Sequence, residues 1–409
     1  MACLKSALFF KVVPVDCGQK SMDILIFGGN GFIGSHIVEK LIENRHKITL
    51  INRNHWPWDT STTIRSKVFR NFILDRLDMN SAENFRNQVI NDRITSAGNQ
   101  NIPFDLVIDL SAYTLSALKP FYDILVENRL CKLYVFVSTD SVYEVCQIDR
   151  RSNQFLKETD AIRPTNISEA EKMNALDSYG HRKLQIEEFL RRRESSKNGL
   201  PYLILRLPDV LGERDSTKRW WKYQMWIENF RLLDTPIVIP DFARNLKTSY
   251  VYVKDVAKLV ALICEYPKAQ IQSSKIIDKV YNFAYPEAKS LTELLVHINQ
   301  ATNVRRVDMT KASDAHQTKD NTFYFPSVTL GALDISAFGK NFPNFVFTPW
   351  EEMVHNIAGF YKKSSKDFPR ERDETASSLC RDIGVEFDVC NKLMTYLLVD
   401  AEKKFNEDL

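Results

Sequence analysis

The glycine-rich stretch at residues 23–35 limits the folds open to this chain more than any other feature of the sequence. It begins with an unbroken apolar run, 24–27, and continues into a turn with glycines at positions 28, 29, 31 and 34. Apolar residues at helical spacing follow, so the stretch predicts a strand, a tight turn and the start of a helix. Glycine permits the sharp bend and lets a phosphate approach the backbone, and a helix N-terminus presents unpaired N–H groups to it. The pattern therefore favours a dinucleotide-binding turn over an ordinary turn without a ligand.

Strand-like and helical segments alternate along the first half of the chain. Strands are expected at 47–51, 69–74, 104–110, 132–137 and 201–207, with helical patterns between most of them. This alternation predicts an α/β fold with a doubly wound parallel sheet of Rossmann type. We expect an N-terminal extension (1–21), an NAD(P)-binding domain (22–212), a smaller C-terminal α/β substrate lobe interleaved with it (213–361), and a charged linker with a helical tail (362–409).

Composition excludes several classes of protein. The net charge of +3 over 409 residues is too mild to indicate nucleic-acid binding by itself. Seven scattered cysteines without a Cys-x-x-Cys motif predict reduced thiols, a cytoplasmic location and no metal site. No apolar run reaches the roughly 18–20 residues that a membrane helix needs. Residues 1–21 are read as an unstructured or strand-like extension, with a weak targeting segment as the alternative.

The end of the second expected strand bears on the choice of cofactor. An Asp or Glu about 20 residues after the glycines would accept a hydrogen bond from the adenosine ribose and favour NAD. This chain has Asn52 and Arg53 there. A guanidinium suits a 2′-phosphate, so the sequence predicts NADP in preference to NAD. The alternative is an arginine that only faces solvent.

Two further motifs carry candidate chemistry. Ser138-Thr139-Asp140 follows the strand expected at 132–137, at the sheet edge where open α/β sheets bind ligands. Tyr179 and Lys183 are four residues apart on an expected helix and therefore share one face. An ammonium beside a phenol favours the phenolate and lowers the phenol pKa, which suits proton exchange with a substrate. The alternatives are a hydroxyl-rich strand cap and a surface Tyr/Lys pair.

In this order the motifs resemble the extended short-chain dehydrogenase/reductases, the NAD(P)-dependent epimerase/dehydratase family, over about residues 22–361. Further matches are the segments 206–212, 252–257 and 281–284. The resemblance implies a nicotinamide cofactor, Tyr179 as catalytic acid/base, Lys183 on the nicotinamide ribose, and Thr139 bonded to the reacting oxygen. Ser138 and Asp140 are accessory candidates. Expected cofactor contacts, besides Tyr179 and Lys183, are Gly28, Gly31, Phe32, Ile33, Gly34, Asn52, Arg53, Asp75, Arg76, Leu110, Ser111 and Ala112.

The chain also departs from the family pattern. Nucleotide-sugar dehydratases carry Thr-Asp-Glu where this chain has Thr139-Asp140-Ser141, so an oxidoreductase or epimerase is favoured over a dehydratase. Asp209 replaces an asparagine, and Glu144 replaces a glycine. These features are closer to a divergent branch that includes chloroplast stem-loop-binding proteins. A nucleotide-sensing or RNA-binding protein with reduced catalysis is therefore the alternative function.

Aromatic and basic residues gather after residue 212. Such residues can stack a sugar and bind a phosphate, or they can pack a small lobe onto the sheet. The substrate is expected to be a small molecule, with a nucleotide sugar favoured, and the helix of Tyr179 permits a homodimer without requiring one. The expected substrate contacts are Arg214, Arg219, Trp220, Arg244 and Lys247.

Overall fold

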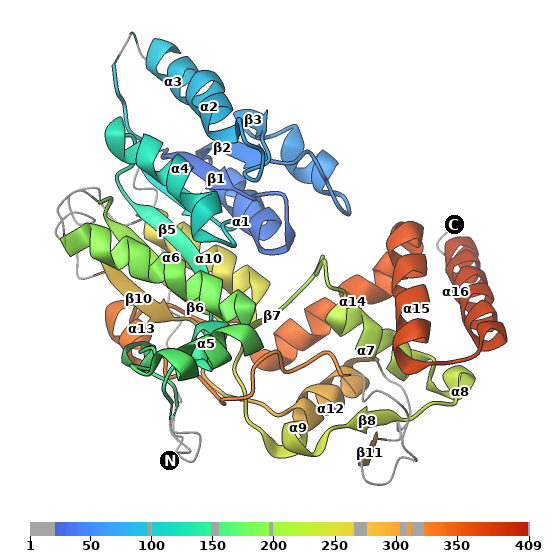
Figure 1. The fold of residues 1–409 in the computed structure, drawn as a ribbon. Helices are drawn as coiled ribbons and strands as arrows, with labels where there is room; N and C mark the ends of the chain where they lie inside the picture. The colour runs from blue at the N-terminus through green and yellow to red at the C-terminus, as the bar shows by residue number, and fades with distance from the viewer. Residues whose placement is uncertain are drawn as a thin grey trace, which may run out of the picture.

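The structure is a computed structural model, and it describes residues 21–96, 98, 100–148, 155–195, 199–265, 276–302, 309–311 and 323–407. A seven-stranded parallel sheet forms its centre, in the order β10–β6–β5–β4–β1–β2–β3 (Figure 1). This confirms the predicted doubly wound α/β fold of Rossmann type. The strands are β1 (Asp23–Phe27), β2 (Lys47–Asn52), β3 (Arg70–Ile73), β4 (Leu106–Asp109), β5 (Tyr134–Thr139), β6 (Tyr202–Leu207) and β10 (Lys279–Asn282).

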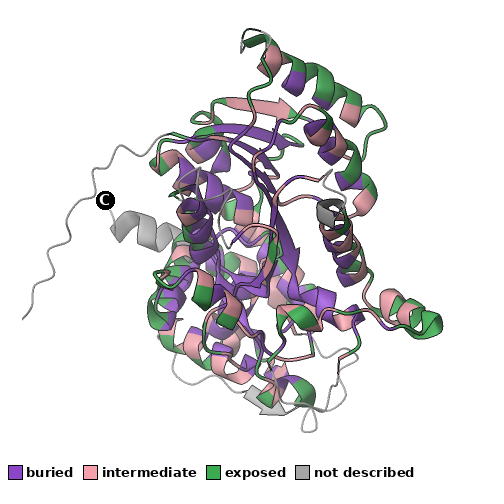
Figure 2. Ribbon diagram, turned by 90° about the vertical axis from the view of Figure 1, so that its left-hand side faces the viewer, coloured by how far each residue is buried: buried purple, intermediate pink, exposed green. Residues whose placement is uncertain are grey.

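The sheet is covered on both faces because its central strands are apolar on both sides. In β1, Ile24 and Ile26 belong to one core cluster, whereas Leu25 and Phe27 belong to another. Helices α1 (Phe32–Glu43) and α10 (Val253–Glu265) contribute to the first cluster, and α4 (Leu115–Glu127) and α6 (Ser178–Ser195) to the second. The strands accordingly form a buried layer through the molecule (Figure 2).

Helix α6 shows why a dimer cannot be read from its apolar residues. Leu184, Ile186 and Leu190 are buried inside the chain itself. The ring of Phe189 packs against Tyr122 of α4, with the ring centroids 5.4 Å apart. These apolar residues of α6 therefore pack within this chain.

The remaining elements form the rim of the sheet and a second, smaller lobe. Two short parallel pairs, β7 with β9 and β8 with β11, belong to the lobe. The shorter helical segments and these strands are η1 (Ser61–Arg65), α2 (Ser81–Asn84), η2 (Phe85–Ile90), α3 (Asn91–Ser96), η3 (Asp140–Val145), η4 (Glu158–Asp160), α5 (Ile167–Leu176), β7 (Asp209–Leu211), α7 (Arg219–Glu228), α8 (Phe230–Leu233), β8 (Ile237–Ile239), α9 (Asp241–Asn245), β9 (Tyr250–Tyr252), α12 (Leu291–Thr302), β11 (Met309–Lys311) and α13 (Ser336–Asn341).

The C-terminal helices differ from the expectation. Residues 362–374 were expected to be a charged linker, but α14 (Trp350–Asp367) runs on through them and α15 (Pro369–Ile383) begins after Phe368. Gly384, in the left-handed region with φ of 67°, ends α15 before α16 (Phe387–Glu407). These helices pack beside α7 and α8, at the right of Figure 1. The expected N-terminal extension lies, except for residue 21, outside the described residues.

Candidate active site

A cleft of about 1830 Å³ runs along the carboxyl ends of the central strands. It is lined by the glycine turn after β1, the loop after β2, the ends of β4 and β5, and the start of α6. Parallel strands bring their carboxyl ends to one edge of the sheet, which is where this fold binds ligands. Segments far apart in sequence therefore meet in a single site.

The glycine turn leaves the start of α1 open toward this cleft. Gly28 has a φ of +81°, and a Cβ on Gly34 would lie 2.3 Å from the Gly28 carbonyl oxygen. A Cβ on Gly31 would meet only that oxygen, at 3.6 Å. Gly31 caps α1 without a side-chain hydrogen bond, and the first helical turn has no acidic residue. Its free N–H groups and positive dipole end therefore fit the pyrophosphate of a dinucleotide.

The loop after β2 gives Asn52 and Arg53 different roles. Asn52 is buried, donates from Nδ2 to Oδ1 of Asn71 at 2.5 Å, and accepts from the Asn54 amide at 2.8 Å. Asn52 therefore shapes the loop. Arg53 is exposed and lines the cleft. Of these two predicted cofactor residues, Arg53 is the one placed to meet a charged ligand group.

Arg76 and Asp109 form a buried ion pair beside the glycine turn. Nη1 of Arg76 lies 2.8 Å from Oδ1 of Asp109, and the guanidinium stacks on Phe27 at 4.2 Å. Burial alone would raise the pKa of Asp109, but the adjacent Arg76 outweighs it and leaves that pKa lowered. Two other nitrogens of Arg76, Nε and Nη2, are buried and have no hydrogen-bond partner. Arg76 therefore holds the end of β4 at the edge of the cleft that it lines.

The other predicted cofactor residues lie around the same opening. Phe32, Ile33, Asp75, Leu110 and Ser111 line the cleft. Ala112 is buried and does not line it, but its carbonyl oxygen contributes to the site by accepting a hydrogen bond from Lys183.

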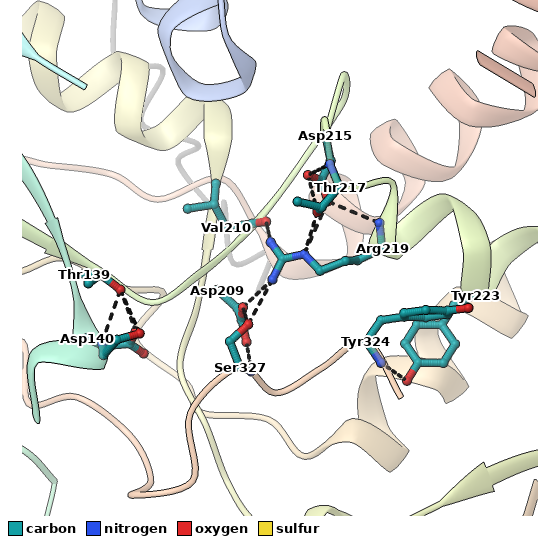
Figure 3. Close-up of polar contacts among 11 residues, drawn as sticks. Thr139, Asp140, Asp209, Val210, Asp215, Thr217, Arg219, Tyr223, Tyr324 and Ser327 are labelled. Atoms are coloured by element: carbon teal, nitrogen blue, oxygen red, sulfur yellow. Dashed lines mark hydrogen bonds and ion pairs between the residues drawn. The ribbon is translucent and has the colours of Figure 1, made fainter. Parts of the chain in front are cut away.

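Thr139 and Asp140 lie where β5 turns into η3. Oγ1 of Thr139 accepts from the Ser141 amide at 3.2 Å and lies 3.3 Å from Oδ1 of Asp140 (Figure 3). Asp140 is buried. That burial, with the negative charge of Asp209, raises the pKa of Asp140 well above its ordinary value. The site therefore contains a carboxyl group that favours its protonated form.

Tyr179 and Lys183 share a face of α6, as predicted from their spacing, but their environments differ. Tyr179 is 42% exposed and lines the cleft, with its ring 6.3 Å from that of Tyr113. Lys183 is buried, and its Nζ donates to the carbonyl oxygens of Ala112 at 3.1 Å and Val137 at 2.8 Å. Burial lowers the pKa of Lys183 to about 8.

The expected effect of Lys183 on the phenol is not found. The pKa of Tyr179 is raised, first by burial and then by Tyr113 and Asp140, while a hydrogen bond with Thr139 acts in the opposite direction. Lys183 is not among the groups that shift the pKa of Tyr179, and its ammonium donates instead to the carbonyl groups of Ala112 and Val137. In this state Tyr179 is a proton donor held near Thr139.

Ser138 faces a buried network as well as the cleft. Its hydroxyl donates to Oε1 of Glu187 at 2.6 Å, and Glu187 forms an ion pair with Arg206. The predicted accessory role of Ser138 is thus combined with a structural one, since its hydrogen bond ties β5 to α6.

Arg219 is the predicted substrate residue that the structure brings to the cleft. Its guanidinium donates to Asp209 at 2.5 Å, to Ser327 at 3.1 Å and to Thr217 at 2.9 Å (Figure 3). Asp215 lies 3.5 Å away. Arg219 is therefore fixed in position and largely neutralised by carboxylates.

The other four predicted substrate residues do not line the cleft. Arg214 forms ion pairs with Glu39 and Asp59, and Lys247 pairs with Glu293. Trp220 is buried in the same core cluster as Ile24 and Ile26 of β1. Arg244 lies in the last turn of α9 and does not line the cleft.

Several residues that the sequence did not single out as site residues line the cleft. Tyr113 follows the end of β4, much as Thr139 ends β5, and this position could have marked it. Ser327 lies more than a hundred residues from its partner Asp209, so no local pattern points to it. Other examples are Asn30, His55, Leu74, Leu77, Glu169, Lys172, Met173 and Thr329.

The described residues contain neither a metal-binding cluster nor a membrane-spanning helix. No group of three or more His, Cys, Asp or Glu side chains there is arranged to hold a metal ion. No helix in the described part of the chain has the length and apolar character needed to cross a membrane.

The fold is shared with several enzymes of known structure. The UDP-glucose 4-epimerase of Thermotoga maritima, determined with UDP-glucose, matches with a TM-score of 0.58 and 18% identity, over 84% of this chain and 99% of that one. The dTDP-glucose 4,6-dehydratase of Bacillus anthracis, determined with NAD, matches with a TM-score of 0.59 and 14% identity, over 85% of this chain and 99% of that one. The UDP-N-acetylglucosamine 4-epimerase of Methanobrevibacter ruminantium has a TM-score of 0.57 and 20% identity, over 84% of this chain and 99% of that one.

Sequence comparison agrees with this fold. A protein of Methanocaldococcus jannaschii that carries the provisional name UDP-glucose 4-epimerase is 26% identical over 237 residues, which are 58% of this chain and 71% of that protein. The model of the NAD dependent epimerase/dehydratase family matches residues 24–284, more than half of the chain. This chain therefore belongs to the NAD-dependent epimerase/dehydratase family.

Proposed function

We propose that this protein is an NAD(P)-dependent oxidoreductase or epimerase that acts on a hydroxyl or carbonyl carbon of a nucleotide sugar. One observation carries the proposal: Thr139, Tyr179 and Lys183 meet in the same cleft as the open N-terminus of α1. A proton-transfer group and a dinucleotide site in one cleft are what hydride-transfer chemistry requires. The names of the similar epimerases support the choice of substrate class.

Each residue has a defined part in this chemistry. A bound nicotinamide supplies the hydride chemistry, accepting a hydride from the substrate carbon or giving one to it. Tyr179 gives a proton to the substrate oxygen as a carbonyl becomes a hydroxyl, and takes that proton back in the reverse direction. Thr139 holds the same oxygen by a hydrogen bond. Lys183 fixes the ends of β4 and β5 around the site and lies one helical turn below Tyr179.

The preference for NADP over NAD remains part of the proposal and rests on Arg53. An exposed guanidinium at the end of β2 matches a 2′-phosphate in charge and geometry. The dissociation constants for NADPH and NADH, measured on wild type and Arg53→Gln, test this choice. Loss of NADPH affinity without loss of NADH affinity is expected. NADH binding as tight as NADPH binding in wild type would exclude this role for Arg53.

Two other functions receive less support. A dehydratase would need a glutamate where Ser141 stands in this chain. A nucleotide-sensing or RNA-binding protein without turnover would not need Thr139, Tyr179 and Lys183 together in the cleft. Tight dinucleotide binding with no turnover on a broad panel of nucleotide sugars would favour the second of these.

The decisive experiment is turnover on that panel, followed by NMR of the sugar and by absorbance of the reduced cofactor. Tyr179→Phe should lower the rate by roughly 10²–10⁴-fold while dinucleotide binding is kept. Tyr396→Phe, an exposed tyrosine on α16, is the matched control and should have wild-type activity. Wild-type rates in Tyr179→Phe would rule out the proposed mechanism.

A further inference from the structure

The ring of Trp58 is inserted into an aromatic cluster built by the C-terminal half of the chain. Trp58 lies in the loop between β2 and η1. Its ring centroid is 5.6 Å from Trp221 of α7, 5.6 Å from Phe360 and 6.1 Å from Tyr361 of α14, and 5.2 Å from Phe368. We call these five residues the Trp58 cluster. The Trp58 ring therefore contacts four rings from the C-terminal half of the chain.

The same loop faces the cleft with its other residues. Arg53, His55 and Pro57 line the cleft where the adenosine ribose is expected. The His55 carbonyl accepts a hydrogen bond from Asn30 of the glycine turn. The loop therefore lies between the dinucleotide site and the Trp58 cluster.

The conformation of the loop also needs support from outside. Asn54 and Trp58 have φ of 61° and 58°, in the left-handed region that non-glycine residues rarely adopt. Such a conformation persists when surrounding contacts fix it. Trp58 provides these contacts through its ring, and the next residue, Asp59, adds an ion pair of 2.9 Å with Arg214.

The Trp58 cluster also reaches the substrate half of the cleft. The Tyr361 ring stacks on Trp221 with the centroids 5.1 Å apart. The Tyr361 hydroxyl donates to the Gly212 carbonyl at 3.0 Å and accepts from the Asp215 amide at 3.1 Å. Asp215 lines the cleft beside Arg219. One cluster thus touches both the loop of Arg53 and the loop of Asp215.

We propose that Trp58 is a positioning residue that fixes Arg53 over the adenosine ribose, so that helix α14 and the start of α15 help to set dinucleotide affinity and the discrimination of a 2′-phosphate. The inference rests on the proposed dinucleotide-dependent function. Phe360, Tyr361 and Phe368 all lie beyond residues 24–284, the part matched by the family model.

The test compares two tryptophans of the same loop in the full-length protein. Trp58→Ala removes the cluster contact. Trp56→Ala is the matched control, because the Trp56 indole donates to Asn54 within the loop and stacks with Arg65 rather than with the cluster. The dissociation constants for NADPH and NADH are measured by calorimetry, and the thermal unfolding of the ligand-free protein is recorded for each variant.

Trp58→Ala should weaken NADPH binding by roughly tenfold and NADH binding by less, because a displaced Arg53 no longer meets the 2′-phosphate. Trp58→Phe should keep most of the wild-type ratio between the NADH and NADPH dissociation constants, and Trp56→Ala should leave this ratio unchanged. Phe368→Leu should act in the same direction as Trp58→Ala, and the double variant should add little to the larger single effect.

The inference would be overturned if Trp58→Ala weakened the binding of both dinucleotides equally. It would also be overturned if Trp56→Ala lowered the ratio of the dissociation constants as much as Trp58→Ala does. If Trp58→Ala does not fold, Phe368→Leu serves for the same comparison, and an unchanged ratio of the two dissociation constants in that variant would overturn the inference. Wild-type protein that binds neither dinucleotide would instead overturn the proposed function, and the inference with it.

Discussion

Glu187 of α6 and Arg206 of β6 form an ion pair of 2.6 Å in which both side chains are fully buried. Glu187 lies one helical turn after Lys183, and it also accepts a hydrogen bond from Ser138 of β5. Arg206 in turn donates to the Tyr143 hydroxyl at 2.9 Å. The helix that carries Tyr179 is therefore held to the strands behind Thr139 by a charged network inside the protein.

Removing one partner of this pair should destabilise the fold strongly. Glu187→Ala leaves the Arg206 charge buried without its partner, which costs about 3–5 kcal/mol of unfolding free energy. Urea unfolding measures this loss. Glu188→Ala is the matched control, because the pair of Glu188 with Arg163 is partly exposed and should contribute less than about 1 kcal/mol. If the two variants lost similar amounts of unfolding free energy, burial would not be the reason why the Glu187–Arg206 pair stabilises the fold.

Much of the fold could be predicted because its signals are local. The apolar run of β1 is buried, and the glycines that follow it permit the observed turn, in which a Cβ on Gly34 would clash with the Gly28 carbonyl oxygen. The four-residue spacing of Tyr179 and Lys183 places both on one side of α6 by helical geometry alone. These features need only short-range sequence patterns.

Other parts of the site depend on contacts that no local pattern encodes. Lys183 bonds to carbonyl groups of two different strand ends, so its effect on Tyr179 could not be judged from their spacing. Trp58 meets rings more than 160 residues away. Residues 362–374 are rich in charge and therefore resemble a linker in sequence. In the structure they belong to two packed helices, and Arg372 is buried and donates to the Ser365 carbonyl.

Asp140 should make the fold less stable at neutral pH than at acid pH. Its pKa is raised in the folded protein, mainly by burial, so the folded state holds a proton that the unfolded state releases above the ordinary value of 3.8. The contribution of Asp140 to the free energy of unfolding therefore falls as pH rises from 3.8 through the pKa that Asp140 has in the folded protein. Asp140→Asn should raise the midpoint of thermal unfolding at pH 7, and the gain should vanish near pH 3.

Asp109 provides the opposite control for this pH dependence. Its pKa is lowered, because Arg76 outweighs the effect of burial, so its contribution to stability is present above pH 3.8 and is lost as pH falls through the folded pKa. Asp109→Asn should therefore lower the unfolding midpoint at pH 7. If the two variants shifted the midpoint in the same direction, the opposite charge environments assigned to them would be incorrect.

The two glycines at the start of α1 should respond differently to a methyl group. Gly34→Ala places a Cβ 2.3 Å from the Gly28 carbonyl oxygen, and this overpacking should cost roughly 1–3 kcal/mol. Gly31→Ala makes no such clash and should cost less than about 1 kcal/mol. The new methyl group lies at the position proposed for the pyrophosphate, however, so dinucleotide binding should fall by roughly tenfold. Calorimetry of binding and thermal unfolding separate the two effects, and unchanged dinucleotide binding in Gly31→Ala would place the pyrophosphate elsewhere.

Asp209 should control how strongly the cleft attracts anions. Its carboxylate lies 2.5 Å from the Arg219 guanidinium and accepts a further hydrogen bond from the Ser327 amide at 2.7 Å. Asp209→Asn removes one negative charge and leaves Arg219 with Asp215 as its carboxylate partner. Binding of UDP, an anionic fragment of the proposed substrates, should tighten by roughly tenfold, or about 1.4 kcal/mol.

Calorimetry with UDP measures this change, and Glu144→Gln is its matched control. Glu144 lines the same cleft but accepts hydrogen bonds from Thr329, so its neutral variant removes an equal charge without altering the Asp209–Arg219 pair. A gain confined to Asp209→Asn would assign the effect to Arg219. Equal gains in both variants would mean that only the net charge of the cleft matters. If neither variant gained affinity, the diphosphate would not bind in this half of the cleft, and the Asp209–Arg219 pair would instead face the sugar.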